Sequence, residues 1–393
     1  MPRPSFQHAI ALAAATACAT DLAAQACGPA LNLGVDCVGL SIGNSHRWTG
    51  LRLNFADKDV RQVDGVNLVL WKPPKDRNDR ALYQGLVFGL APEGGQFRGV
   101  TIGVGGAVAH RSFAGINVGG LGLVSDGTMQ GINFGGLALV AEEDMRGINL
   151  GGLGAVSQGR MVGLNIGGLG LVTQGDVKGV NVGGLGAVSQ GAMSGLTLGG
   201  LAAVSQGSMI GISLGGLAAV SQGRMTGLTV GGLAAVAEGR IRGVTLGGLA
   251  TVGNDDVSGL TVAGLAVVAG RNLTGVMVGG LAVVADRRIR GMTVTLGAVE
   301  APRQVTGFTV AGYRIKTSAI EGLNIAGWLK TTDLHGASVA AFNQVRGAQR
   351  GLTIGIVNSA DVLHGIQLGI LNRAGNNRPP FRWLPIFNAH FDD

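Results

Sequence analysis

Glycine recurs in this chain at every sixteenth position, without an insertion or a deletion. The series runs from Gly99 to Gly307 in thirteen equal steps. The nine residues GGLAAVSQG, for example, occupy 199–207 and occur again at 215–223. Spacing this strict indicates that every unit has the same surroundings, because an inserted residue would break register with the units on both sides. The chain is therefore predicted to be an array of stacked structural repeats.

Each unit has the pattern of two short strands joined by two tight turns. If the periodic glycine is position 1, Gly occupies up to four of the 16 positions, and each would cost a helix about 1 kcal/mol relative to Ala. Residues 196–198, Leu-Thr-Leu, alternate with period two, as a strand does. The Gly-Gly and Gln-Gly dipeptides are turn signals. Apolar positions 2, 4, 7, 10 and 15 are expected to form the interior. The Asn or Thr at position 3, from Asn117 to Thr309, is expected to form a flat ribbon, which resembles ice- or sugar-binding surfaces, although such ladders also simply satisfy one another.

These features predict an all-β fold, a β-solenoid in which each sixteen-residue unit forms one coil. One alternative is an outer-membrane β-barrel with one strand and one turn per unit. Successive barrel strands run in opposite directions, so only every second unit should then be alike, whereas here neighbouring units are alike. Barrels also carry aromatic girdles, whereas 115–306 contains one aromatic residue, Phe134. The second alternative, an array of hairpins, leaves a very long open sheet.

The N-terminus has the pattern of an export signal. Arg3 supplies a positive charge, 9–17 is a short apolar core, and Ala24-Gln25-Ala26 matches the cleavage pattern. Residues 1–26 are therefore predicted to be a signal peptide, and the mature chain to be exported to the cell surface, the outer membrane or the medium. Cleavage leaves two cysteines, Cys27 and Cys37, which are expected to form a disulfide in an oxidising compartment.

The period also divides the rest of the chain. Residues 27–98 are expected to be an irregular β region or cap with candidate unit starts at Gly50, Gly65 and Gly85, and 99–306 to hold thirteen repeats of the regular length. Residues 307–378 hold shorter repeats, each fourteen or fifteen residues long, and 379–393 form a closing segment.

No pattern of catalytic, cofactor-binding or metal-binding residues stands out, and the chain is predicted not to be an enzyme. A phosphate loop is a single strand-to-helix junction with a Lys-Ser/Thr partner, which these glycines lack. Calcium-binding β-rolls place Asp in their turns, as in G-G-x-G-x-D, whereas the equivalent Gly-Gly-Leu stretch here has no carboxylate ligand. His335, Arg350 and His364 should form one column, which is expected to be a solvated basic edge. Any enzymatic site would have to lie in 38–98, where His46, Asp57, Asp59 and Asp64 show no spacing linked to known chemistry.

The charged residues of the repeats gather near the Gln-Gly turn. Mixed signs there suit a solubilising edge, and only 287–290 is dense enough to suggest anion binding, through Arg287, Arg288 and Arg290. The net charge of +7 permits contact with acidic surfaces. The partners to be expected are a cell-envelope component, a glycan or another surface protein, and no nucleic acid.

Two strings near the C-terminus, GLTIGIVN at 351–358 and GIQLGILN at 365–372, are followed by LPIFN at 384–388. In this style of repeat the chain resembles the bacterial surface repeat-containing proteins first labelled in Leptospira and common in Bacteroidetes. The resemblance is strongest over 351–391, and it implies export and a surface location without an established activity. The function expected is that of a non-enzymatic, structural or adhesive surface protein. A solute-conducting outer-membrane barrel is the alternative, and an ice- or glycan-binding solenoid a more distant one.

Overall fold

A computed structural model describes residues 27–74 and 78–391 of the chain. The contacts divide the chain into two units, of which unit 1 ends at Gly184 and unit 2 begins at Leu185. The predicted signal peptide at 1–26 lies outside the described residues. Within the described ranges, no helix is both long enough and apolar enough to cross a membrane.

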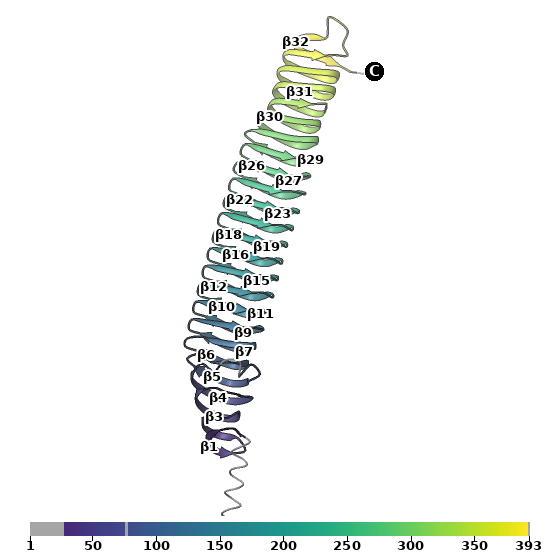
Figure 1. The fold of residues 1–393 in the computed structure, drawn as a ribbon. Helices are drawn as coiled ribbons and strands as arrows, with labels where there is room; N and C mark the ends of the chain where they lie inside the picture. The colour runs from purple at the N-terminus through teal and green to yellow at the C-terminus, as the bar shows by residue number, and fades with distance from the viewer. Residues whose placement is uncertain (1–26, 75–77, 392–393) are drawn as a thin grey trace, which may run out of the picture. The chain divides into compact units, whose positions relative to one another are not determined.

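Both units consist of strands joined by tight corners (Figure 1). Unit 1 contains β1 (Ala30–Val35), β2 (Val38–Gly43), β3 (Arg47–Ala56), β4 (Gln62–Trp71), β5 (Leu82–Gly89), β6 (Glu93–Gly103), β7 (Ala107–Gly119), β8 (Gly122–Ser125), β9 (Thr128–Gly135), β10 (Ala138–Ala141), β11 (Met145–Gly151), β12 (Gly154–Ser157), β13 (Met161–Gly167), β14 (Gly170–Thr173) and β15 (Val177–Gly183). Unit 2 contains β16 (Gly186–Ser189), β17 (Met193–Gly199), β18 (Ala202–Ser205), β19 (Met209–Gly215), β20 (Ala218–Ser221), β21 (Met225–Gly231), β22 (Ala234–Ala237), β23 (Ile241–Gly247), β24 (Ala250–Gly253), β25 (Val257–Ala263), β26 (Ala266–Ala269), β27 (Asn272–Gly279), β28 (Ala282–Ala285), β29 (Arg288–Thr295), β30 (Ala298–Thr331), β31 (Asp333–Ala374) and β32 (Trp383–His390).

Strands one coil apart pair in parallel, and the paired residues are one repeat apart in the sequence. In unit 1, β11 pairs with β13 and Gly147 stands opposite Gly163. In unit 2, β18 pairs with β20 and Val204 stands opposite Val220. Each regular coil thus adds one long and one short strand to two parallel ladders. The fold is the predicted β-solenoid. Parallel pairing of one coil with the next is inconsistent with an array of hairpins and with the alternating strands of a barrel.

The same pairing extends into the region that the sequence marks as irregular. Strands β3, β4, β5 and β6 pair in parallel, and this aligns Gly50, Gly65, Gly85 and Gly99 in one column. The three candidate unit starts in this region are therefore real coil positions, although their spacing in sequence is uneven.

The periodic glycine is required by its backbone conformation and by its neighbours. Gly211, for example, has φ of 109°, in a region that residues with a side chain rarely adopt. A Cβ atom at this position would lie 2.3 Å from the carbonyl oxygen of Gly195, the same residue of the preceding coil. The column therefore needs glycine in every coil for two independent reasons.

The interior of the coil differs from the prediction at four of its five positions. Position 15 is buried as expected, as Met193 and Met209 show. Positions 2, 4, 7 and 10, however, point outward, and the interior is formed by positions 3, 5, 9 and 11, which are occupied in one coil by Thr197, Gly199, Ala203 and Ser205.

The reason is the narrowness of the coil at its Gly-Gly corner. A Cβ atom at Gly199 would lie 1.9 Å from the carbonyl oxygen of Ala202 across the turn. Position 5 therefore faces the interior only as glycine or another small residue, and the alternation of the strand turns positions 2 and 4 outward. Position 9 accepts larger residues, as the buried Leu123, Leu139 and Leu171 show.

The Asn column predicted to be a flat ribbon is a buried ladder. In unit 1, Asn117, Asn133, Asn149, Asn165 and Asn181 are all fully buried. Each amide nitrogen from Asn117 to Asn165 donates to the amide oxygen of the next coil, over 2.8 to 2.9 Å. Buried polar groups that are paired in this way are tolerated inside a protein. The Asn ladder is therefore not available as a surface for ice or glycan binding.

The outer ends of the ladders are covered by antiparallel strands. In unit 1, β1 pairs antiparallel with β2, and in unit 2, β32 pairs antiparallel with the last part of β31. An exposed parallel edge would invite another chain to pair with it, so these reversals end each ladder in the way that a solenoid requires.

Candidate functional site

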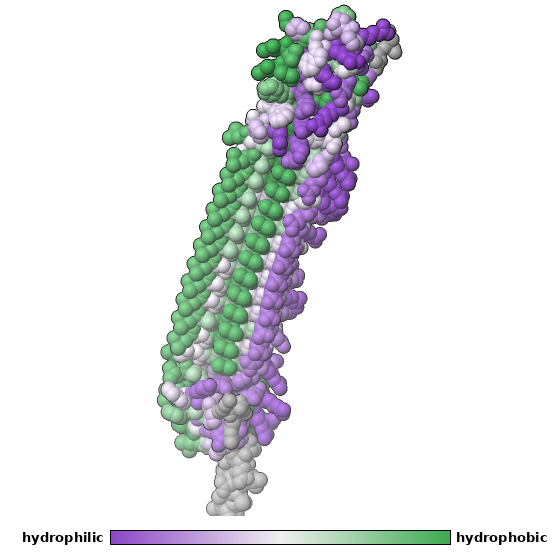
Figure 2. Space-filling view, turned by 45° about the horizontal axis from the view of Figure 1, so that its top comes forward, coloured by the Kyte–Doolittle hydropathy of each residue, from purple (hydrophilic) through white to green (hydrophobic). Residues whose placement is uncertain are grey.

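Each unit has an apolar face, formed by the outward residues at positions 2, 4, 7, 8 and 10. Between 115 and 290, no charged residue occurs at positions 2 to 10 of any repeat. The leucine at position 7 forms the corner, and its side chain is about half exposed: 48% in Leu201, 47% in Leu217 and 48% in Leu233. Figure 2 shows the resulting rows of hydrophobic side chains beside a hydrophilic row.

The backbone beneath this apolar face is hydrogen-bonded even at the corner. The N–H of Leu217 donates to the carbonyl oxygen of Leu201 over 2.7 Å, and the N–H of Ala218 donates to the same oxygen over 3.1 Å. The N–H of Gly216 donates to Gly199 over 3.1 Å. The N–H groups of the corner therefore donate to the preceding coil, beneath the exposed aliphatic side chains.

The apolar face widens into a hollow in the first coils of unit 1. Its volume is about 730 Å³, and it lies over β3, β4 and β5. Phe55, Leu70 and Phe88 line it and are themselves exposed.

The opposite corner is a polar edge, formed by positions 12, 13, 14 and 16, and it carries every charged residue between 115 and 290. In unit 1, Asp144 accepts hydrogen bonds from the backbone and side chain of Arg160 and from Arg146, at 2.8 to 3.0 Å. Partial burial raises the pKa of Asp144, but these hydrogen bonds outweigh it and lower the pKa to about 2. In unit 2, Asp255 is paired with Arg240 and Arg271.

The structure brings together two of the three arginines predicted to bind anions. Arg288 and Arg290 line a groove of about 290 Å³ in the polar edge of unit 2, together with Arg240 and Arg242. Arg287 is not among the residues that line it. Arg240 and Arg242 lie three whole repeats before Arg288 and Arg290. The period therefore places the two pairs in the same rows of the polar edge, and the groove could have been predicted from it.

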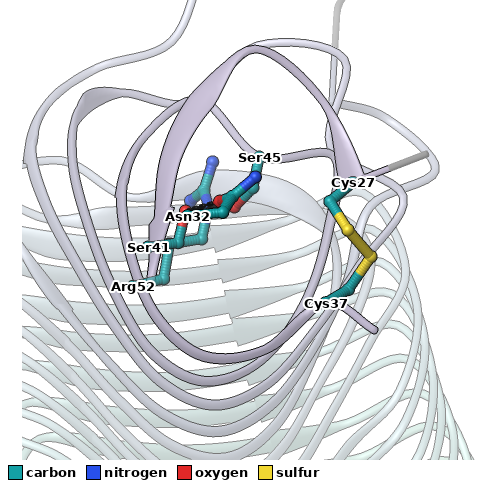
Figure 3. The surroundings of a disulfide bond; sticks show 6 residues. All are labelled: Cys27, Asn32, Cys37, Ser41, Ser45 and Arg52. Atoms are coloured by element: carbon teal, nitrogen blue, oxygen red, sulfur yellow. Dashed lines mark hydrogen bonds between the residues drawn. A yellow bond between two sulfur atoms is a disulfide. The ribbon is translucent and has the colours of Figure 1, made fainter. Parts of the chain in front are cut away.

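The predicted disulfide is present between Cys27 and Cys37, whose Cα atoms are 5.5 Å apart. Figure 3 shows it on one side of the first turn of chain, with Arg52 apart from it and beside Ser45 and Asn32. The bond ties the residues before β1 to the turn between β1 and β2, where the sequence predicts a cap.

Arg52 is the centre of a buried polar network that sequence reasoning missed. It is fully buried, and it donates to Asp57 over 2.5 Å and to Asn67 over 2.8 Å. The hydroxyl of Tyr83 donates to Asp57 over 2.7 Å, and burial followed by the nearby Asp57 carboxylate raises the pKa of Tyr83 well above its usual value. Asp57, one of the acidic residues considered for an enzymatic site, is 2% exposed, so it holds the coils together and does not face a substrate.

The histidines lie in separate places. His110 contacts Asp126 over 2.8 Å and Glu93 over 3.2 Å. Burial lowers the pKa of His110, and the hydrogen bonds to the two carboxylates outweigh it, so that its pKa is raised. In the predicted basic column, Arg350 Nη1 lies 3.4 Å from His335 Nε2. The ring of His364 stands edge-on to that of His390, with ring centroids 6.4 Å apart. Across 27–74 and 78–391, no group of three His, Cys, Asp or Glu residues is placed to hold a metal ion.

Comparison with known proteins gives no match, since no family model, no curated protein and no solved structure is similar to this chain.

Proposed function

We propose that this chain is an exported, non-enzymatic protein of the cell envelope, and that its apolar face lies against lipid. The observation that carries the proposal is the division of every coil between 115 and 290 into an uncharged aliphatic side and a polar edge. Monomeric soluble proteins rarely expose an apolar patch larger than a few hundred Å², and larger patches mark interaction sites. Export is supported by the signal pattern at 1–26 and by the disulfide, which is compatible with an oxidising compartment.

Lipid suits this face because the backbone N–H groups beneath it are already paired. An apolar phase offers no hydrogen bonds, so backbone N–H and C=O groups that enter it must be satisfied within the protein. The parallel ladders do this along the strands, and at the corner the N–H groups of Leu217 and Ala218 donate to the carbonyl oxygen of Leu201.

A specific protein partner fits the face less well. Protein interfaces depend on aromatic and arginine anchors and on about one hydrogen bond per 100–200 Å². The face between 115 and 290 offers one aromatic residue, Phe134, and no arginine. Its rows of side chains are uniform from coil to coil, so a protein partner could not distinguish one position along the face from the next. Contact with a fluid lipid phase, in contrast, requires only a sufficient area of exposed apolar surface.

The corner leucines alone supply enough energy for stable attachment. Complete burial of a leucine contributes about 1.5–3 kcal/mol, so burying the exposed half of one contributes roughly 1 kcal/mol. Unit 2 has seven such leucines in one row, each 44% to 61% exposed: Leu185, Leu201, Leu217, Leu233, Leu249, Leu265 and Leu281. Together they give about 7 kcal/mol, more than a single myristoyl chain, which binds membranes with a constant of about 10⁴ M⁻¹.

Flotation with uncharged vesicles tests the proposal. The mature protein is mixed with phosphatidylcholine vesicles and centrifuged through a density gradient, alongside Leu201→Glu/Leu217→Glu/Leu233→Glu. The matched control is Gln190→Glu/Gln206→Glu/Gln222→Glu, which adds the same three charges at exposed positions of the polar edge. Circular dichroism and thermal unfolding show whether both variants are folded.

We expect the native chain and the glutamine variant to float with the vesicles, and the folded leucine variant to remain at the bottom. A native chain that stays in the lipid-free fraction as a dimer or larger assembly would assign the face to a second copy and overturn the proposal. Equal flotation of the two variants would also overturn it.

A further inference from the structure

The arginine groove lies in unit 2, across the start of four long strands. It is lined by polar residues only, at positions 14 and 16 of four consecutive coils: Arg240, Arg242, Asp256, Ser258, Asn272, Thr274, Arg288 and Arg290. These positions belong to the polar edge, so the groove does not form part of the apolar face and its role is independent of lipid binding.

Strand register fixes the order of these side chains. Arg242, Ser258, Thr274 and Arg290 stand opposite one another on β23, β25, β27 and β29. Neighbouring strands are about 4.8 Å apart, so the backbones of Arg242 and Arg290 are roughly 14 Å apart. The groove therefore has an arginine pair at each end, Arg240 with Arg242 and Arg288 with Arg290, and hydroxyl and amide groups between them.

Most of the positive charge in the groove is not neutralised. Arg240 forms ion pairs with both Asp255 and Asp256, with its Nε atom 3.2 and 3.7 Å from their Oδ2 atoms. Asp256 also accepts a hydrogen bond from Asn272 over 2.8 Å. In contrast, Arg242, Arg288 and Arg290 form no ion pair with any residue of the described ranges. Four arginines and one aspartate line the groove, which gives a local charge of +3.

We propose that this groove binds an acidic oligosaccharide, with anionic groups held at both ends and sugar hydroxyls between them. Arginine binds carboxylate, sulfate and phosphate groups through two parallel hydrogen bonds. Ser258, Thr274 and Asn272 carry hydroxyl and amide groups, which are suited to the hydroxyl groups of a sugar. An isolated small anion would use one end of the groove only, whereas the two arginine pairs match an extended ligand.

Nucleic acid fits this groove less well than a glycan. Sites for single strands combine a basic groove with aromatic side chains on which the bases stack. The residues that line this groove include no aromatic side chain. The groove offers charge and hydroxyl groups, which are what an acidic glycan displays, and no surface for stacking.

The experiment uses a heparin-derived oligosaccharide as the probe and isothermal titration calorimetry on the mature protein. Arg242→Gln/Arg290→Gln removes one unpaired arginine from each end. The matched control, Arg224→Gln/Arg346→Gln, removes the same charge at exposed residues of unit 2 outside the groove. Ser258→Ala/Thr274→Ala keeps the charge and removes the hydroxyl groups between the arginine pairs. A single-stranded DNA of equal charge serves as the second ligand.

The groove arginine variant should bind the oligosaccharide at least about tenfold more weakly, because hydrogen bonds to charged groups are the strong ones. The control variant should stay within about twofold of the native chain. The hydroxyl variant should lose about threefold or more for the oligosaccharide and nothing for DNA. The proposal is overturned if the probe does not bind, if the control loses as much as the groove variant, or if DNA binds as tightly as the oligosaccharide.

Discussion

Replacing Gly211 by alanine tests the geometry that stacks one coil on the next. Gly211 has φ of 109°, and holding a residue with a side chain in such a region costs about 1–3 kcal/mol. The added Cβ atom would also lie 2.3 Å from the carbonyl oxygen of Gly195, so the preceding coil has to move by about 1 Å to reach ordinary contact. Overpacking of this kind costs a further 1–3 kcal/mol or so. Gly211→Ala should therefore destabilise unit 2 by about 2–6 kcal/mol.

The matched control is Gly186→Ala in the same unit. The nearest atom to the added Cβ is the carbonyl oxygen of Ala202, at 3.6 Å, and the next coils already have alanine at this position. The change should be neutral, or stabilising by about 0.4–1 kcal/mol, because it restricts the unfolded chain.

Urea unfolding followed by far-ultraviolet circular dichroism compares the two variants, and hydrogen exchange of β17, β19 and β21 locates the effect. Solenoids can unfold in parts, so the local exchange rates are the decisive reading. If the Gly211→Ala variant unfolds like the native chain and its backbone amides exchange at the same rates, the coil geometry is wrong. Position 1 would then not have the positive φ and the close contact with the preceding coil that the structure shows.

Four further substitutions probe the interior and the polar edge. Met209→Ala should lower the free energy of unfolding by about 2–5 kcal/mol in thermal or urea unfolding, because Met209 is 1% exposed. Val204→Ala should lower it by less than about 1 kcal/mol, because Val204 points outward. A larger cost for Val204→Ala would support the interior expected from hydropathy. Asn149→Ala should cost about 2–4 kcal/mol, because it leaves a buried donor and a buried acceptor of the ladder unpaired, and an unchanged unfolding midpoint would contradict the ladder. The pKa of Asp144, lowered to about 2, predicts that unit 1 keeps the stabilisation from this carboxylate above about pH 4 and loses it as the pH falls toward 2; Asp144→Asn should lack this acid-dependent step in pH-dependent unfolding.

The stacking of the coils could be predicted from the sequence because it depends on spacing alone. The regular period predicts that Val204 lies between Val188 and Val220, and the register shows this. The Cys27–Cys37 disulfide follows from the export pattern and the number of cysteines. Both inferences depend on counting and not on which way a side chain points.

The orientation of the strands could not be predicted from their alternation. A period of two tells which residues share a face, but not which face lies inside, and hydropathy gave the wrong answer at positions 2, 4, 7 and 10. The deciding factor is the tight Gly-Gly corner, where a Cβ atom at Gly199 would lie 1.9 Å from the carbonyl oxygen of Ala202, so that position 5 faces the interior without a large side chain. The glycine at position 5 of most regular repeats was the available signal.

The buried network around Arg52 is beyond sequence reasoning for a different reason. Its partners Ser45, Asp57, Asn67 and Tyr83 come from several coils with uneven spacing. No periodic rule places them together, so only the fold reveals that these polar side chains satisfy one another.

Spin labels on the two sides of one coil test the lipid-facing arrangement most directly. The mature chain has only the two cysteines of the disulfide, so a cysteine introduced as Leu217→Cys or Gln222→Cys is the single free thiol to label. On addition of phosphatidylcholine vesicles, the label at 217 should become more accessible to oxygen and less accessible to a water-soluble nickel chelate, while the label at 222 stays in water. The account is contradicted if both labels remain in water, or if the label at 217 is already immobile and shielded in dilute, lipid-free protein.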